Sequence, residues 1–379
     1  MAKKRIANQG TVFRRRDGRW EGRLNLGFVG GKRRRKSFYA DTQAEVSAKL
    51  VAAVRALQLG QKPAPGILTV KDFFANWLQE IAKPIIRPAT YKGYEVALRT
   101  HVLPQLGAVK LVNLGPDDLD ERYTKLLKEG LSATYIRLIH AVIHRGLSHA
   151  ERRSLVGRNV ASLVTPPRVS RKEVVALTPE QASRFLAATE DDRLHSLYVV
   201  AIHTGLRLGE LCGLRWRDCS QDFISVRQQV SRIYGEWHFS EPKTKAGRRN
   251  ITLSAAASEA LRQHRLRQTE ERLAAKDWED HDLVFPDTRG GPLERTNLMR
   301  RSFKPALKRA GLPAIRFHDL RHTAATLLLA GGIHAKVVQE MLGHSSVAIT
   351  LDIYSHTTPN LQAEAAAKMD DLLPAAANS

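Results

Sequence analysis

The sequence predicts a multidomain α+β protein: a small N-terminal three-stranded sheet plus a helix, an all-α bundle, and a mainly α third domain with a small antiparallel sheet. Three observations support this fold class. Apolar and basic residues alternate around turn signals in residues 1–40. Apolar residues recur at helical spacing from residue 67 to about 165. Linkers at 61–66 and 164–174 then divide the 379 residues into domains 1–63, 64–168 and 169–379.

The first domain concentrates positive charge. The net charge is +22, and residues 1–40 hold thirteen lysines and arginines against two acidic residues. Turn signals at Asp17-Gly18 and Gly30-Gly31 separate three strands, and Thr42 begins a helix that ends at Gly60. A surface with so much positive charge attracts polyanions, so nucleic acid is the expected partner. The expected DNA contacts are Arg14, Arg15, Arg16, Arg19, Arg33, Arg34, Arg35 and Lys36. The alternatives are a generally adhesive basic protein and a basic arm that folds only on DNA.

Local signals locate elements in the other two domains. Thr69 and Ser132 are expected helix caps in the bundle, and Thr178 is expected to cap the first helix of the third domain. Alternating runs at 222–230, 236–242 and 248–254 predict strands, with residues 243–247 as the hairpin turn between the last two. We expect no membrane span, because the chain has no apolar run of 18 or more residues, and no secretory signal, because no apolar region follows the basic start MAKKRIANQG. Its two cysteines, Cys212 and Cys219, fit a reducing compartment.

Two helical segments of the third domain carry charged side chains at matching spacing. Arg207 and Glu210 are three residues apart, which alone indicates a local ion pair. His318 and Arg321 are also three apart and are expected to share one helix face. Phosphate oxygens are well bound by guanidinium groups, because these stay charged and donate in pairs.

The second segment has a rival interpretation. The run HDLRH, residues 318–322, is similar to the zinc-protease pattern H-E-x-x-H, with Asp319 in the place of the glutamate. A third ligand would have to come from His334, Glu340 or His344. Arg321 would then place a cation beside the metal, so the prediction is that no metal binds here.

A late tyrosine completes a set of residues suited to phosphoryl transfer. His344 follows a helix that ends at Gly343, and Tyr354 lies ten residues after it. A tyrosine hydroxyl can attack phosphorus when nearby cations lower its pKa. A lysine can protonate the leaving oxygen, and arginines can stabilise the charge of the transition state.

Five motifs, TGLRLGEL, PKTKAGRR, FHDLRHT, LGHSS and YSH, occur in this order. With them the sequence resembles the tyrosine recombinases, specifically phage-type integrases with an N-terminal arm-binding domain, over nearly the whole chain. The resemblance implies a site-specific recombinase that cleaves and rejoins DNA through a 3′-phosphotyrosyl intermediate, without metal, cofactor or ATP, in integration and excision. A resolvase or invertase of the same chemistry and a non-enzymatic DNA-binding regulator are the alternatives.

The resemblance also implies a role for each matching residue. Arg207 and Arg321 would hold the scissile phosphate, and Glu210 would orient the helix of the first arginine. Lys243 would be the general acid, with Lys245 as the alternative. His318 would support proton transfer, His344 would bind a non-bridging oxygen, and Tyr354 would be the nucleophile. His322 and His356 are interpreted as structural.

Partners and location follow from the same resemblance. Domain 1–63 would bind arm-type sites, and the other two domains would bind core-type sites on double-stranded DNA. The expected assembly is a homotetramer on DNA, in which the tail, residues 358–379, docks on a neighbouring protomer. A host DNA-bending protein and an excisionase are further expected partners. The expected location is the bacterial cytoplasm, at the nucleoid and away from membranes, with the gene carried by a phage or another mobile element.

Overall fold

The computed structural model of the chain describes residues 10–29, 32–58, 68–170, 175–242 and 244–357, together with Ala366 and Met369. The chain divides into two compact units, Met1–Ser170 and Arg171–Ser379. The tail, residues 358–379, falls outside the described residues, apart from Ala366 and Met369.

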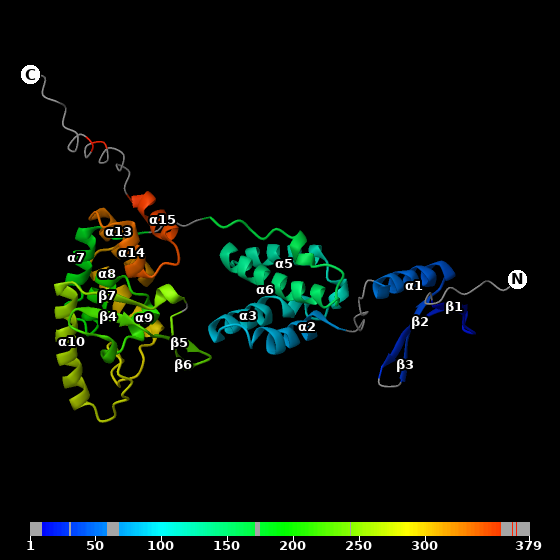
Figure 1. The fold of residues 1–379 in the computed structure, drawn as a ribbon, viewed down its shortest axis with the longest axis horizontal. Coiled ribbons are helices and arrows are strands. Elements are labelled where there is room, and N and C mark those ends of the chain that lie inside the picture. The colour runs from blue at the N-terminus through cyan, green and yellow to red at the C-terminus, as the bar shows by residue number, and fades with distance from the viewer. Residues whose placement is uncertain are drawn as a thin grey trace, which may run out of the picture. The chain divides into compact units, whose positions relative to one another are not determined.

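The first unit begins with the predicted three-stranded sheet and helix. The sheet is antiparallel in the order β1 (Thr11–Arg14), β2 (Trp20–Val29) and β3 (Lys32–Ala40), and α1 (Gln43–Gln58) packs on it (Figure 1). Val46 and Leu50 of α1 are buried. The Thr42 hydroxyl accepts a hydrogen bond from the Glu45 amide over 3.3 Å, as the predicted cap requires. The prediction of a folded sheet plus helix is therefore confirmed.

The same unit continues as the predicted all-α bundle. Its helices are α2 (Val70–Asn76), α3 (Pro88–His101), α4 (Leu103–Leu106), α5 (Pro116–Lys128) and α6 (Ala133–Arg152), with 3₁₀ turns at Leu111–Asn113 and Val160–Leu163. The last turns of α2 run directly into a π-helical segment, Trp77–Ala82. Thr69 and Ser132 cap α2 and α6 as predicted. Phe74, Leu98 and Ile139 are among the side chains that fill the bundle core.

The second unit is mainly helical. Its helices are α7 (Pro179–Ala187), α8 (His195–Thr204), α9 (Leu208–Cys212), α10 (Ala255–Ala274), α11 (Arg295–Leu298), α12 (Lys304–Arg309), α13 (Phe317–Ala330), α14 (Ala335–Leu342) and α15 (Val347–Thr357); η6 (Met299–Phe303) is a π-helical link. Thr178 caps α7 as predicted. Nearly every residue of α8 is buried, and this helix contacts both α10 and α13 (Figure 1). A helix that is apolar on all sides belongs in a core. The C-terminal end of α8 leads directly into the turn that carries Arg207.

The strands of this unit form two separate antiparallel pairs. β4 (Phe223–Val226) pairs with β7 (Arg249–Thr252), and β5 (Gln229–Ile233) pairs with β6 (Glu236–Ser240). The predicted run 222–230 is thus two strands, and the predicted hairpin across 243–247 is wrong because β6 and β7 are not partners. The tight hairpin lies instead at Tyr234-Gly235, where both residues have positive φ, the geometry that a two-residue turn needs.

Candidate active site

Arg207 is presented by a sharp turn between two helices. The backbone at Gly205 has φ +61° and ends α8, and Arg207 then begins α9. A Cβ at position 205 would lie 2.2 Å from Leu342 Cδ2 and 3.3 Å from Ala324 Cβ. Only glycine fits there, because α13 and α14 pack against this turn. The turn therefore joins Arg207 to the helices that carry the other predicted residues.

Glu210 is the buried partner of two arginines. Arg207 donates from Nη1 to Glu210 Oε1 over 2.8 Å, and its backbone N–H donates to Oε2 over 3.0 Å. Arg249 donates from Nη2 to Oε2 over 3.0 Å. Glu210 is 3% exposed, so one carboxylate in a dry environment fixes both guanidinium groups. Arg207 also donates from Nη2 to the Gly343 carbonyl over 3.3 Å, which leads toward His344.

Arg321 lies beside this pair and is 3% exposed. Its Nη1 donates to the Gly205 carbonyl over 2.8 Å. Among the described residues, its buried Nη2 has no hydrogen-bond partner. A buried guanidinium nitrogen without a partner is costly, so this geometry favours a ligand with an acceptor oxygen.

Three histidines adjoin the arginines. His344 is buried, and its Nδ1 lies 2.9 Å from the Thr350 hydroxyl in α15. The His318 and His322 rings meet edge to face, with centroids 5.0 Å apart. His318 keeps solvent-accessible surface, whereas the Nδ1 of His322 is buried with no hydrogen-bond partner within the described part of the chain.

The clustered cations change the pKa values of their neighbours. Burial, and then the charges of Arg207 and Arg249, lower the pKa of Arg321 to about 9. Burial, followed by the charges of Arg321 and Arg207, lowers the pKa of His344 to about 4. Partial desolvation, then His322 and Arg321, lowers the pKa of His318 to about 4. Near neutral pH the arginines are therefore charged and both imidazoles are neutral, an arrangement suited to an anion.

Asp319 has a structural role that conflicts with the zinc interpretation. Its Oδ2 accepts from the Arg316 backbone N–H over 2.7 Å, and its Oδ1 accepts from Arg316 Nη2 over 2.7 Å. The carboxylate therefore caps α13 and is not free to act as a base. In the described ranges, no group of three or more His, Cys, Asp or Glu side chains could hold a metal ion.

The predicted nucleophile and general acid are only partly described. The backbone of Tyr354 lies in α15, one helical turn after Thr350, and α15 packs against α13 and α14. The side chain of Tyr354 is outside the described residues, as is all of Lys243. The backbone of Lys245 begins a 3₁₀ turn, Lys245–Gly247, directly before β7. Arg207, Glu210, His318, Arg321 and His344 are thus the predicted residues that the structure brings together.

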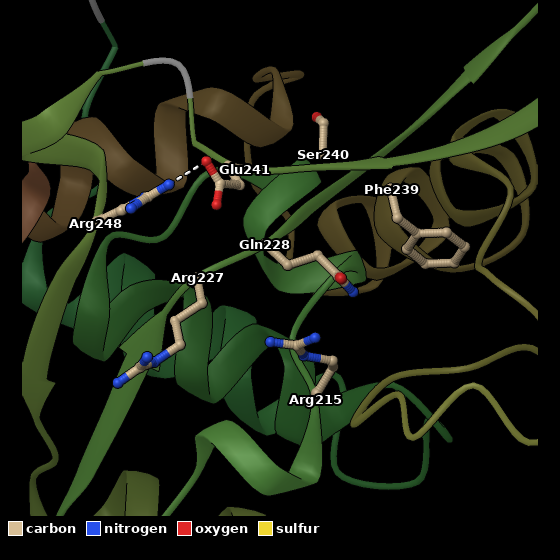
Figure 2. Close-up of a pocket in the computed structure, with 7 residues that line it drawn as sticks. All are labelled: Arg215, Arg227, Gln228, Phe239, Ser240, Glu241 and Arg248. Atoms are coloured by element: carbon tan, nitrogen blue, oxygen red, sulfur yellow. Dashed lines mark hydrogen bonds and ion pairs between the residues drawn. The ribbon is translucent and has the colours of Figure 1, made fainter.

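A basic cavity of about 350 Å³ opens next to β7. It is lined by Arg215, Arg227, Gln228, Phe239, Ser240, Glu241 and Arg248 (Figure 2). Arg248 pairs with Glu241, and Arg215 pairs with Asp218 over 2.6 Å. Arg227 is 67% exposed and lies 3.7 Å from the Asp218 carboxylate. Its charge is the least neutralised of the three arginines, which makes it the best placed to meet a polyanion.

The predicted DNA contacts of the N-terminal sheet lie mostly at its surface. Arg14, Arg15, Arg16, Arg19 and Arg35 are exposed, and Lys36 is half-buried with its ammonium 5.7 Å from the Phe38 ring centroid. Arg15 and Arg19 both pair with Asp17. The side chains of Arg33 and Arg34 are outside the described residues.

Arg249 is a residue of the candidate site that the sequence did not predict. It bonds the same carboxylate, Glu210, as Arg207 does. Its side chain is 6% exposed. The signal for it is weak: strand alternation puts Arg249 on the same face as Ile251, which is buried. A charged residue at an inward-facing strand position needs a buried partner, but nothing local identifies Glu210 as that partner.

Comparison with protein families gives two matches. Residues 176–360 match the phage integrase family, and residues 69–127 match the phage integrase N-terminal SAM-like domain. The first match contains the clustered side chains of the candidate site: Arg207, Glu210, Arg249, His318, Arg321, His322 and His344. The second lies within the all-α bundle.

Individual relatives agree with these matches. An integrase of Streptomyces ambofaciens is 35% identical over 373 residues, covering 93% of this chain and 94% of its own. A tyrosine recombinase XerC-like protein of Caldanaerobacter subterraneus subsp. tengcongensis is 29% identical over 366 residues, covering 90% and 93%. The solved Tn1549 transposon integrase, in complex with transposon right end DNA, is 26% identical with a TM-score of 0.67, covering 80% of this chain and 99% of that one. The chain therefore belongs to the phage integrase family and is a tyrosine-type site-specific recombinase.

Proposed function

We propose that this recombinase is the integrase of a phage or similar mobile element and that the arginine pair Arg207 and Arg321 binds the scissile phosphate. The observation that carries the phosphate site is the buried Nη2 of Arg321, which has no hydrogen-bond partner among the described residues. A non-bridging phosphate oxygen would supply the missing acceptor. The match to an integrase over 93% of this chain supports the mobile-element assignment.

The proposed reaction conserves the number of phosphodiester bonds. The Tyr354 hydroxyl attacks phosphorus, gives up its proton, and forms a bond to the 3′-phosphate. The bond between phosphorus and the 5′-oxygen breaks, and that oxygen leaves as a hydroxyl after it takes a proton from Lys243, or from Lys245. A 5′-hydroxyl from another strand then reverses these steps and displaces the tyrosine. No bond energy is lost, so no ATP is needed.

The two histidines fit roles as neutral groups. His344 would donate to a non-bridging oxygen, and its Nδ1 contact with Thr350 fixes the ring orientation. His318 would accept the tyrosine proton during cleavage and return it during rejoining. Guanidinium groups supply the charge stabilisation, aimed at the oxygens that become more negative in the transition state.

Each of the three predicted domains has a DNA-binding role in this proposal. Domain 1–63 binds arm-type sites through its exposed arginines, and domains 64–168 and 169–379 bind the core site. A resolvase or invertase needs no arm-binding domain, so the folded N-terminal sheet favours an integrase. Deletion of residues 1–63 is expected to abolish arm-site binding and to leave core-site cleavage intact.

We further propose a homotetramer on DNA, held by exchange of the tail 358–379. Four apolar side chains on or just before α14 and on α15 are 43–54% exposed: Ile333, Val337, Ile349 and Leu351. The apolar face of an amphipathic helix in the tail could cover them. Deletion of residues 360–379 should impair ordered strand exchange more than DNA binding. Unchanged exchange would contradict the tail model.

The remaining expectations concern location and accessory proteins. Within the described ranges, no helix combines the length and the apolarity needed to cross a bilayer. We place the protein at the bacterial nucleoid, because its substrate is chromosomal and mobile-element DNA. A host bending protein would bring arm and core sites together, and an excisionase would set the direction.

A covalent adduct is the decisive readout. We would incubate the full chain with nicked duplexes prepared from the DNA that flanks its gene, in EDTA, and separate the products on a denaturing gel. Wild type should form a protein–DNA adduct, and Tyr354→Phe should form none. Tyr234→Phe, in the exposed β5–β6 turn, is the matched control and should form the adduct normally. DNA binding without any wild-type adduct would favour the non-enzymatic regulator.

A further inference from the structure

Arg249 contacts three segments of the second unit at once. Its Nη2 donates to Glu210 Oε2 over 3.0 Å, in α9. Its Nε donates to the Met341 carbonyl over 2.6 Å, at the end of α14. Its Nη1 donates to the Gly247 carbonyl over 3.0 Å, in the turn that begins at Lys245. One buried guanidinium therefore joins the helix of Arg207, the segment before His344 and the lysine-bearing turn.

These contacts separate Arg249 from the phosphate-binding arginines. All three of its side-chain nitrogens have protein partners, and its side chain is 6% exposed. Arg321 is 3% exposed and keeps one nitrogen without a partner within the described residues. With a further Nη1 bond to Glu210 Oε1 over 3.4 Å, the contacts of Arg249 use four of the five guanidinium N–H donors. Arg249 is therefore held by the protein and is placed to act through its neighbours.

We propose that Arg249 is a positioning residue that fixes Glu210, and through it Arg207, at a set distance from the chain segment of His344. The inference rests on the proposed function. Packing at Gly343 supports it: a Cβ there would lie 2.6 Å from the Ala246 carbonyl oxygen and 3.0 Å from Arg249 Nη1. The lysine-bearing turn, Arg249 and the end of α14 are thus in direct contact, and displacement of one displaces the others.

The charge of Arg249 also keeps Glu210 ionised. Arg207, at the N-cap of α9, and Arg249, in β7, donate to this carboxylate, and the charge of Arg321, in α13, interacts with it. Burial would raise the pKa of Glu210, but the charge and hydrogen bond of Arg249, followed by those of Arg207, hold the pKa below its ordinary value. Loss of Arg249 raises that pKa, so Glu210 takes up a proton more readily and binds Arg207 less well.

Arg249→Gln tests the proposal on the adduct assay with nicked duplexes from the gene's flanking DNA. We expect the rate of adduct formation at neutral pH to fall on the order of 100-fold, because misplaced catalytic groups cost about that much. DNA affinity by gel shift should change little. The defect should shrink as pH rises, since higher pH restores the Glu210 carboxylate. Arg262→Gln is the matched control: Arg262 in α10 is 63% exposed, pairs with Glu259 over 2.7 Å, and should give the wild-type rate and pH profile.

Two more variants separate positioning from simple stability. Arg249→Lys keeps the positive charge but loses the planar guanidinium that bonds several acceptors at once. It should therefore show the wild-type pH profile, because Glu210 stays ionised, and only part of the wild-type rate of adduct formation. Arg249→Gln combined with Glu210→Gln should lose less rate than the two single losses multiplied together, because both variants break the same Arg249–Glu210 contact. Additive losses, or an Arg249→Gln rate equal to wild type below its melting temperature, would overturn the proposal. Absence of a wild-type adduct would instead overturn the proposed function, and this inference with it.

Discussion

Arg321 donates a hydrogen bond to the carbonyl of Gly205 over 2.8 Å, which ties α13 to the turn that presents Arg207. The two arginines are 114 positions apart in the sequence, yet one backbone oxygen sets their relative positions. The phosphate site thus depends on the shape of a glycine turn as much as on the two guanidinium groups.

Arg321→Lys should lose cleavage and keep DNA binding. A lysine has no planar fork, so it cannot bond the Gly205 carbonyl and a phosphate oxygen with two parallel donors. We expect adduct formation to fall by roughly 10²–10³-fold, the effect of losing one preorganised donor. Arg309→Lys, at an exposed position in α12, should leave the rate unchanged. A normal rate for Arg321→Lys would show that charge alone is enough.

Gly205→Ala and Gly311→Ala form a matched pair. Both glycines have positive φ, +61° and +63°, but a Cβ at Gly311 meets no atom within 4 Å. Gly311→Ala should lower the free energy of unfolding by about 1–2 kcal/mol, because its only penalty is an alanine in the left-handed conformation. Gly205→Ala adds the clash with Leu342, roughly 1–3 kcal/mol more, and should also slow cleavage. Urea unfolding of the full chain measures both; equal losses would contradict the packing described for α14.

His344 should make stability depend on pH. Its pKa is about 4 in the folded protein, below the ordinary value of about 6.5. Between these values the unfolded chain binds the proton more readily, so protonation favours unfolding. The stabilisation that His344 contributes is present above about pH 6.5 and is lost as pH falls toward about 4. His344→Gln should flatten the dependence of unfolding free energy on pH in this range by up to one proton, as urea unfolding at a series of pH values would measure.

Arg227→Ala should weaken DNA binding in a salt-dependent way. Arg227 lines the basic cavity, is 67% exposed and has only a 3.7 Å contact with Asp218. Loss of one phosphate contact should reduce the slope of log affinity against log salt by about 1. Arg217→Ala is the control, because Arg217 is 64% exposed but pairs with Asp282 over 2.7 Å. Equal slopes for both variants would exclude the cavity from the DNA interface.

Local signals in the sequence predicted local structure well. Thr69, Ser132 and Thr178 cap their helices as predicted, because an N-cap hydroxyl bonds an amide only three residues away. The hairpin across 243–247 was wrong, because strand partners are chosen by tertiary packing. Tyr234 adopts φ +52° in the real turn, and a non-glycine residue with positive φ is hard to recognise from sequence.

Only part of the candidate site could be predicted, because some of its contacts join residues that are far apart in the sequence. The resemblance identified Arg207, Glu210, His318, Arg321 and His344, and the structure brings these residues together. Arg249 was missed because its partners are distant: Glu210 lies 39 residues away and Met341 lies 92 residues away. Contacts of that range leave no periodicity in the sequence. The geometry of Tyr354 and Lys243 toward the arginines stays a prediction.

The low pKa of Arg321 has a consequence for how this protein balances durability against activity. Burial, and then the charges of Arg207 and Arg249, lower this pKa, so the free protein carries a desolvation and repulsion cost that a phosphate would relieve. Neutralising one arginine would make the free protein sturdier and the enzyme poorer. The free protein is therefore the less stable form, and the DNA-bound protein is expected to have the higher melting temperature.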